Sequence, residues 1–181
     1  MAEYARVGVD TARVEDIVAA AGVSWGTFFH YFPAKEDVLL VAADDISVAY
    51  STALADGLAA GRDTATVLRE GFGAMQNAAL AATESTALRT RMLSYVLEHP
   101  GRLTSVIGDD VLLPVAATSV VMGEGQRRGE VRTDEPAEAL AVIVLYSVLF
   151  TARRGAALGR PPGATPLGWL ALETVLRGMR P

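Results

Sequence analysis

The spacing of apolar residues is the feature that most constrains the fold of this chain. Apolar side chains, many of them alanines, recur every three to four residues, and the strict alternation of a half-buried strand is nearly absent. Alanine has the highest intrinsic preference for helix, and a period of about 3.6 residues places apolar side chains on one face of it. We therefore predict an all-α fold, in which glycine and proline mark the helix ends.

Helix-ending residues divide the chain into predicted helical segments. Gly22, Pro33, Gly61 and Pro100 each end one segment, because glycine accepts a left-handed C-terminal conformation and proline cannot continue a helix. Pro114 lies inside a longer segment and predicts a kink there, or two helices. The predicted segments cover residues 1–6, 13–21, 24–31, 35–60, 64–82, 85–98, 102–128, 135–157 and 167–179.

Composition excludes several classes of function. The 181 residues include no cysteine, which rules out disulfides, thiolate metal sites and a cysteine nucleophile. The net charge of −5 gives no general affinity for nucleic acid or anionic membranes. The longest uncharged apolar stretch, residues 139–152, is shorter than the roughly 18 to 20 residues of a spanning helix, and no secretory signal is visible at the start. We expect a soluble cytoplasmic protein without a cofactor or metal.

Residues 13–32, RVEDIVAAAGVSWGTFFHYF, have the pattern of a helix-turn-helix. A short helix with inward-facing Val14, Ile17 and Val18 is followed by Gly22, which permits a tight turn. The Ser24 hydroxyl is placed to cap the next helix, and Val23 and Phe28 can fill the angle between the two helices. Such a unit is typical of proteins that bind the DNA major groove.

At these residues the sequence resembles the TetR family of bacterial transcriptional regulators. The matching residues are Glu15-Asp16-Ile17, the AGVS run at 21–24, the GTFFHYF run at 26–32 and the KEDVL run at 35–39. The resemblance implies a DNA-binding domain at residues 1–43 and a helical effector-binding and dimerisation domain at residues 44–181. It also implies a homodimer that places residues 24–31 of each subunit in the major groove of a palindromic operator. The implied DNA-contacting residues are Arg13, Ser24, Trp25, Gly26, Thr27, Phe29, His30, Tyr31 and Lys35.

The sequence departs from the family pattern in three ways. Trp25 stands where members often carry Lys or another polar residue, and Phe29 stands where they often carry Tyr. Residues 1–43 hold three basic and six acidic residues, a net charge of −3, although phosphate neutralisation supplies much of the affinity for DNA. Only residues 1–7 precede the next segment where the family has a full first helix. We expect either that the true start lies upstream or that DNA binding is impaired.

Candidate residues in the larger domain come from its apolar faces. Two stripes on residues 139–152 predict burial on two sides, by the chain's own core and by a second subunit, although one large monomeric core would give the same pattern. The candidates for the dimer interface are Leu140, Val144, Val148, Leu167, Leu170 and Val175. The candidates for an effector pocket, which could equally be plain core, are Phe72, Met75, Gln76, Arg91, Met92, Tyr95, Val96 and Val111.

The resemblance implies a ligand-responsive repressor, and two alternatives stay open beside it. One alternative is a dimeric small-molecule-binding helical protein with an impaired DNA-binding domain. The other is an enzyme on a helical bundle, which ranks lower because the chain shows no nucleophile with a base, no metal cluster and no phosphate loop. We therefore predict a regulator that is not an enzyme and whose partners are operator DNA, an unknown small-molecule effector and a second copy of the chain.

Overall fold

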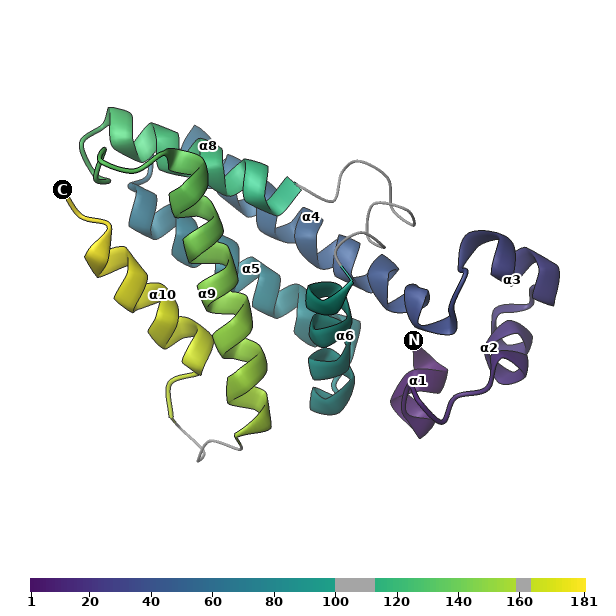
Figure 1. Ribbon diagram of the computed structural model, residues 1–181. Helices are drawn as coiled ribbons and strands as arrows, with labels where there is room; N and C mark the ends of the chain where they lie inside the picture. Colours follow the sequence, from purple (N-terminus) through teal and green to yellow (C-terminus); the bar gives the residue numbers. More distant parts are fainter. Residues whose placement is uncertain (100–112, 159–163) are drawn as a thin grey trace. The chain divides into compact units, whose positions relative to one another are not determined.

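The computed structural model describes residues 1–99, 113–158 and 164–181, and the described part is helical with no strand (Figure 1). The all-α prediction is confirmed, and each predicted segment within the described residues corresponds to a helix. The elements are α1 (Ala2–Val7), α2 (Val14–Ala21), α3 (Trp25–Tyr31), a short 3-10 helix η1 (Lys35–Asp37), α4 (Val38–Ala59), α5 (Thr64–Ala82), α6 (Thr86–Glu98), α8 (Leu113–Arg127), α9 (Ala137–Ala157) and α10 (Leu167–Gly178).

Capping residues explain where several of these helices begin and end. Ser85 precedes α6, and its hydroxyl accepts a hydrogen bond from the Leu88 amide at 3.2 Å. Gly61 follows α4 with φ 70°, a left-handed conformation that glycine adopts without steric cost. Pro114 lies in the first turn of α8, where its missing N–H costs no helical hydrogen bond. The predicted segment upstream of residue 113 falls outside the described residues, so the prediction of a kink or of two helices stays a prediction.

The chain divides into two compact units. Unit 1 consists of Met1–Asp45 and Ala78–Val111, and unit 2 consists of Ile46–Asn77 and Leu112–Pro181. Unit 1 therefore contains both α1–α3 and α6, a helix about sixty residues further along the chain. The functional division into residues 1–43 and 44–181 stays a prediction.

The core of unit 2 is built from five helices. Buried side chains come from α4, α5, α8, α9 and α10, and α9 packs against both α8 and α10 (Figure 1). One polar pair lies within this core: the hydroxyls of Tyr50 and Thr118, both fully buried, are 2.8 Å apart. Burial raises the pKa of Tyr50 well above its ordinary value. The pair satisfies hydrogen-bonding groups that would be costly to bury alone.

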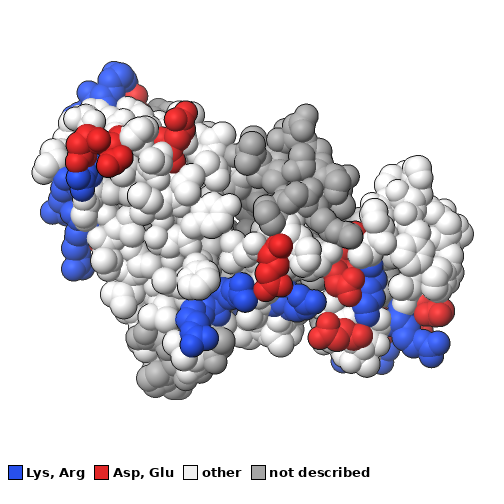
Figure 2. Space-filling model, viewed as in Figure 1, with Lys and Arg blue, Asp and Glu red and all other residues white. Residues whose placement is uncertain are grey.

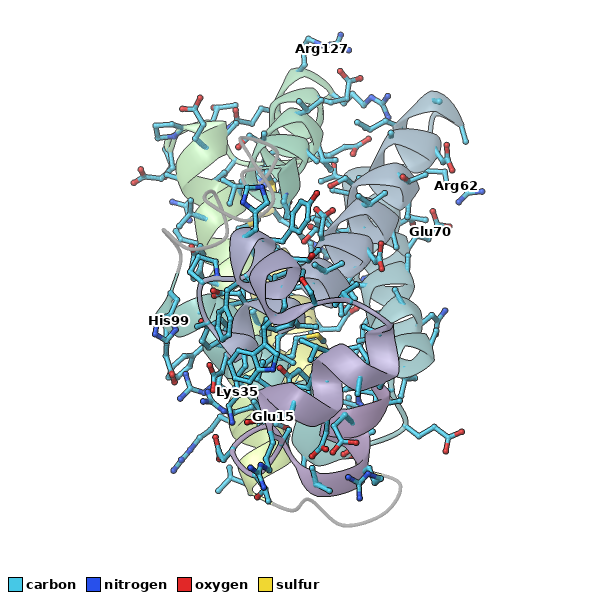
Figure 3. The ribbon with its side chains drawn as sticks, turned by 90° about the vertical axis from the view of Figure 1, so that its right-hand side faces the viewer. Glu15, Lys35, Arg62, Glu70, His99 and Arg127 are labelled. Carbon is cyan, nitrogen blue, oxygen red and sulfur yellow. The ribbon has the colours of Figure 1, made fainter. Side chains whose placement is uncertain are left out.

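Ion pairs and charged hydrogen bonds join helices at the surface of unit 2. Arg69 of α5 donates two hydrogen bonds to the Glu173 carboxylate of α10, at 2.7 and 3.0 Å, and this contact lowers the pKa of Glu173. The guanidinium of Arg62 pairs with Glu70 (Figure 3). Partly exposed pairs of this kind contribute little each, so the apolar core carries most of the stability.

Two helical stretches, Lys35–Ala59 and Ala137–Ala156, are long and apolar enough to cross a membrane by length and composition alone. The core helix of a soluble protein passes the same test. Leu140, Val144 and Val148 of the second stretch are buried in the core of unit 2. Packing within the chain therefore accounts for one face of this apolar stretch.

Candidate nucleic-acid interface

The turn between α2 and α3 has the geometry predicted from the sequence. Gly22 ends α2 with φ 67° and ψ 27°, and its amide donates to the Ala19 carbonyl at 3.2 Å. The Val23 amide donates to the Val18 carbonyl at 3.1 Å, which completes a left-handed helix end of the Schellman type. The prediction of a glycine turn is confirmed.

The start of α3 is capped by Ser24. Its hydroxyl oxygen accepts a hydrogen bond from the Thr27 amide at 3.1 Å and lies 2.8 Å from the Thr27 hydroxyl. Such a cap stabilises a helix by about 1 kcal/mol, which matters for a helix of only 7 residues. The predicted cap is confirmed, and the hydroxyls of Ser24 and Thr27 contact each other.

The inner side of the helix-turn-helix is apolar. Val18 and Phe28 are buried, whereas Val23, which was predicted to fill the same angle, is exposed. The Phe28 ring lies 5.4 Å from the ring of Phe32 and 5.3 Å, edge to face, from that of Phe29. Phe28 therefore fixes the orientation of α3, and its neighbour Phe29 rests partly on it.

The outer side of α3 is aromatic and uncharged. Trp25 is 47% exposed, Phe29 39% and Tyr31 64%, and His30 is exposed beside Tyr31. Trp25 and Phe29 lie one helical turn apart with ring centroids separated by 5.4 Å. The surface over α3 carries no Lys, Arg, Asp or Glu (upper right in Figure 2). Outward-facing side chains on the second helix are what major-groove contact requires.

Lys35, which the resemblance implies as a DNA contact, holds the loop between α1 and α2. Its ammonium donates to the carbonyls of Asp10 at 3.0 Å and Ala12 at 2.9 Å (Figure 3). The buried hydroxyl of Tyr4 donates to the Lys35 carbonyl in turn, and burial raises the pKa of Tyr4. Two of the three ammonium donors are thus used within unit 1, which leaves one for a phosphate.

The two arginines near α2 also contact acidic side chains. Arg6 donates to Glu3 at 2.6 and 2.9 Å, and the Arg13 guanidinium lies 3.8 Å from the Glu15 carboxylate. Both contacts are at the surface, where such pairs exchange readily for other partners. Arg13, which was predicted as a DNA contact, is strongly exposed at the start of α2.

A buried carboxylate connects the start of α4 with α6. Asp37 is fully buried; its Oδ2 accepts from the Ala34 amide at 2.7 Å and its Oδ1 from the Tyr95 hydroxyl at 2.8 Å. The Arg91 guanidinium stands 5.9 Å above the Tyr95 ring and 3.8 Å from the Asp10 carboxylate. The sequence carries no local signal for the link between Asp37 and Tyr95, because the two residues are 58 positions apart.

The candidate pocket residues fall into two groups, one in each unit. In unit 2, Phe72 packs in the core against Tyr50, Met75 is half-buried, and Gln76 accepts a hydrogen bond from the Trp169 indole at 2.7 Å. In unit 1, all four candidates lie on α6, with Met92 and Tyr95 buried and Arg91 and Val96 half-buried. Val111 lies outside the described residues. The other histidine of the chain, His99, is exposed at the end of α6 (Figure 3).

The candidate interface residues on α9 point into the chain's own core. Leu140, Val144 and Val148 are buried there, Leu167 and Val175 of the α10 region are half-buried, and Leu170 is exposed. Neither of the two predicted stripes faces outward as a unit, because each contains both buried and exposed side chains. The large apolar side chains of α9 that are exposed are Val142, Ile143, Tyr146 and Phe150.

Among the described residues, no group of three or more His, Cys, Asp or Glu side chains is arranged to hold a metal ion. The described residues form a capped helix-turn-helix with an exposed second helix, followed by a larger helical body. Residues 1–42 match the family model described as bacterial regulatory proteins, tetR family.

Two solved structures are similar in fold to nearly the whole chain. FadR of Thermus thermophilus, a TetR-family transcriptional repressor in complex with lauroyl-CoA, superposes with a TM-score of 0.74 at 26% identity, over 98% of this chain and 87% of that one. A Mesorhizobium loti protein assigned to the TetR-family regulators superposes with a TM-score of 0.54 at 20% identity, over 99% of this chain and 92% of that one. No match was found among curated proteins. The resemblance is confirmed, and the chain has the fold of TetR-family transcriptional regulators.

Proposed function

We propose that this protein is a cytoplasmic, ligand-responsive transcriptional repressor that binds a palindromic operator as a homodimer. The observation that carries the proposal is the exposed outer face of α3 on a capped and well-packed helix-turn-helix. On such a unit, the second helix contacts base edges and the flanking groups contact phosphates. Arg13, Ser24, Gly26, Thr27, His30, Tyr31 and Lys35, with the aromatic pair Trp25 and Phe29, are the proposed contact residues.

The chain offers a matched pair for testing DNA contact, because it has only two histidines and both are exposed. We expect specific binding to a duplex from the region upstream of its own gene, measured by fluorescence anisotropy. His30→Ala on α3 should weaken this binding, whereas His99→Ala at the end of α6 should leave it unchanged. Equal effects of the two substitutions, with both variants folded, would contradict the proposed role of α3.

The proposed dimer contact uses the outward stripe of α9. Val142, Ile143, Tyr146 and Phe150 form an apolar patch on one helix, and Leu170 adds an exposed leucine on α10. The middle of the surface over α9 is uncharged, with arginines near its end (Figure 2). Apolar patches of this kind on a soluble protein mark contact surfaces, and a self-complementary patch gives a two-fold dimer.

Phe150 and Val120 provide a matched test of this dimer. Their exposed fractions are 61% and 62%, but Phe150 is on α9 and Val120 on α8. Phe150→Asp should shift the sedimentation coefficient from dimer to monomer, because it buries a charge in the interface. Val120→Asp should remain dimeric. A Phe150→Asp variant that sediments as the wild type would exclude the proposed interface.

The proposed effector belongs to the fatty acyl-CoA class. This rests on FadR of Thermus thermophilus, which was solved with lauroyl-CoA. Lauroyl-CoA should lower the affinity for the operator, and the operator should lower the affinity for lauroyl-CoA by the same factor. A ligand that binds without changing operator affinity would rule out induction by this class.

The alternative is a dimeric ligand-binding protein with an impaired DNA-binding domain. It is favoured by one observation: the three basic residues of the first 43 all contact oxygens of the same segment, and that segment has a charge of −3. This alternative predicts no sequence-specific binding at any salt concentration, together with binding of the effector.

A further inference from the structure

We propose that Trp25 and Phe29 form a rigid aromatic surface that selects operator sites by the C5-methyl groups of thymine. The inference rests on the proposed function, since it concerns how α3 reads DNA. In the major groove the thymine methyl is the apolar feature of the base edges, and apolar side chains contact it directly.

The two rings form one continuous surface. They are one turn apart on α3, with centroids 5.4 Å apart and planes inclined at 41°, and each is more than a third exposed. Phe29 also rests edge to face on Phe28, whose ring is buried. The surface is therefore held in place from below, so contact with DNA costs little side-chain entropy.

The remaining chemistry of α3 leaves few other ways to recognise bases. The helix reads WGTFFHY and contains none of the residues that bind guanine, adenine or cytosine edges through two hydrogen bonds or a carboxylate. The Thr27 hydroxyl already contacts Ser24 at 2.8 Å. His30 and Tyr31 lie further along, with ring centroids 5.1 Å apart. The aromatic pair thus supplies the largest exposed surface near the start of the helix.

The charges of the first 43 residues point the same way. Arg6 and Arg13 contact Glu3 and Glu15, and Lys35 donates to two backbone carbonyls. Attraction to phosphate is sequence-independent and contributes less here than in a basic domain. Apolar contact with base edges therefore has to supply a larger share of the binding free energy.

The test replaces thymine by deoxyuridine, which removes the methyl group and leaves base pairing intact. Operator duplexes are first selected from a random pool with the full-length protein. Each thymine of the selected half-site is then replaced in turn, and the affinity is measured by fluorescence anisotropy. We expect replacement of one such thymine to lower the affinity about fourfold, because one buried methyl group is removed, and we expect one or two sensitive thymines per half-site. Replacement in both half-sites removes two methyl groups and should lower the affinity about fifteenfold.

Variants then assign the effect to the two rings. Trp25→Ala or Phe29→Ala should bind the thymine and uridine duplexes equally, because the partner of the methyl is gone. His30→Ala is the matched control on the same helix: its affinity falls, but the ratio between the two duplexes is kept. Circular dichroism checks that each variant is folded, and the uridine scan of the wild-type protein does not depend on any variant.

The outcomes separate the two proposals. Specific binding that is unchanged by uridine at every position overturns the methyl-reading inference and leaves the proposed function standing. If uridine weakens binding of the wild type and weakens binding of both ring variants to the same extent, the methyl group is contacted by another residue. This result also overturns the inference. If no duplex is selected, the proposed function fails, and the inference fails with it.

Discussion

Replacing Tyr95 by phenylalanine should lower the free energy of unfolding by about 1.5–3 kcal/mol, the usual range for a hydrogen bond to a charged group. The Tyr95 hydroxyl donates to Oδ1 of Asp37 at 2.8 Å, and Asp37 is 0% exposed. Phenylalanine has nearly the same volume, so no cavity opens and the loss measures the hydrogen bond. Water cannot replace the donor at a carboxylate this deeply buried without a change in packing.

The assay is urea unfolding followed by circular dichroism, at one fixed protein concentration because a dimer makes stability concentration-dependent. With a slope of about 2 kcal/mol per molar urea, the midpoint should fall by roughly 0.75–1.5 M. Tyr31→Phe is the control, because the Tyr31 side chain is 64% exposed and its hydroxyl should not contribute to the free energy of unfolding. Equal midpoints for the two variants would refute the reasoning that the buried bond stabilises unit 1.

Three further predictions concern packing, pH and Lys35. Gly71→Ala should destabilise the protein by about 1–3 kcal/mol, because the new methyl would lie 2.5 Å from a buried side chain of α4. Gly73→Ala in the same helix meets nothing within 4 Å and should stabilise the protein by up to about 1 kcal/mol. The urea midpoints of the two variants should therefore shift in opposite directions from that of the wild type. The pKa of Glu173 is lowered by its hydrogen bonds from Arg69, so this contact stabilises above the ordinary carboxylate pKa and is lost as pH falls through the lowered value. Unfolding between pH 6 and 3 should therefore depend less on pH in Glu173→Gln, and an unchanged profile would contradict this. Lys35→Met should lower the melting temperature, because the loss of two hydrogen bonds to carbonyls lowers the free energy of unfolding by about 1–2 kcal/mol. A melting temperature equal to that of the wild type would contradict the anchoring role.

Much of the fold was predictable because helix ends depend on local chemistry. Ser24 and Ser85 cap the helices that follow them, and Gly22 ends α2, through contacts within a few residues of each position. The helix-turn-helix was predictable for the same reason, since its turn and cap are encoded in one short run. Pro114 was harder to interpret, because proline is compatible both with a kink and with the first turn of a new helix.

The candidate site was predictable only where one helix defines it. Periodicity indicated that α9 is apolar on two sides, but it could not tell which of its side chains meet the chain's own core. The structure buries Leu140, Val144 and Val148, and leaves Ile143 and Phe150 at the surface. The same limit applied to Lys35, whose carbonyl partners lie 23 and 25 residues away in the chain.

The sequence by itself determined the all-α class, the helix-turn-helix and the uncharged character of α3, because these depend on residue type and on spacing within a few turns. Only the tertiary structure decided that Phe28 supports Phe29 from below, that Lys35 anchors a loop and that Asp37 meets Tyr95 of α6. These contacts join residues that are distant in the chain or choose between equivalent faces of a helix. Their energies depend on burial and geometry, which no local pattern encodes.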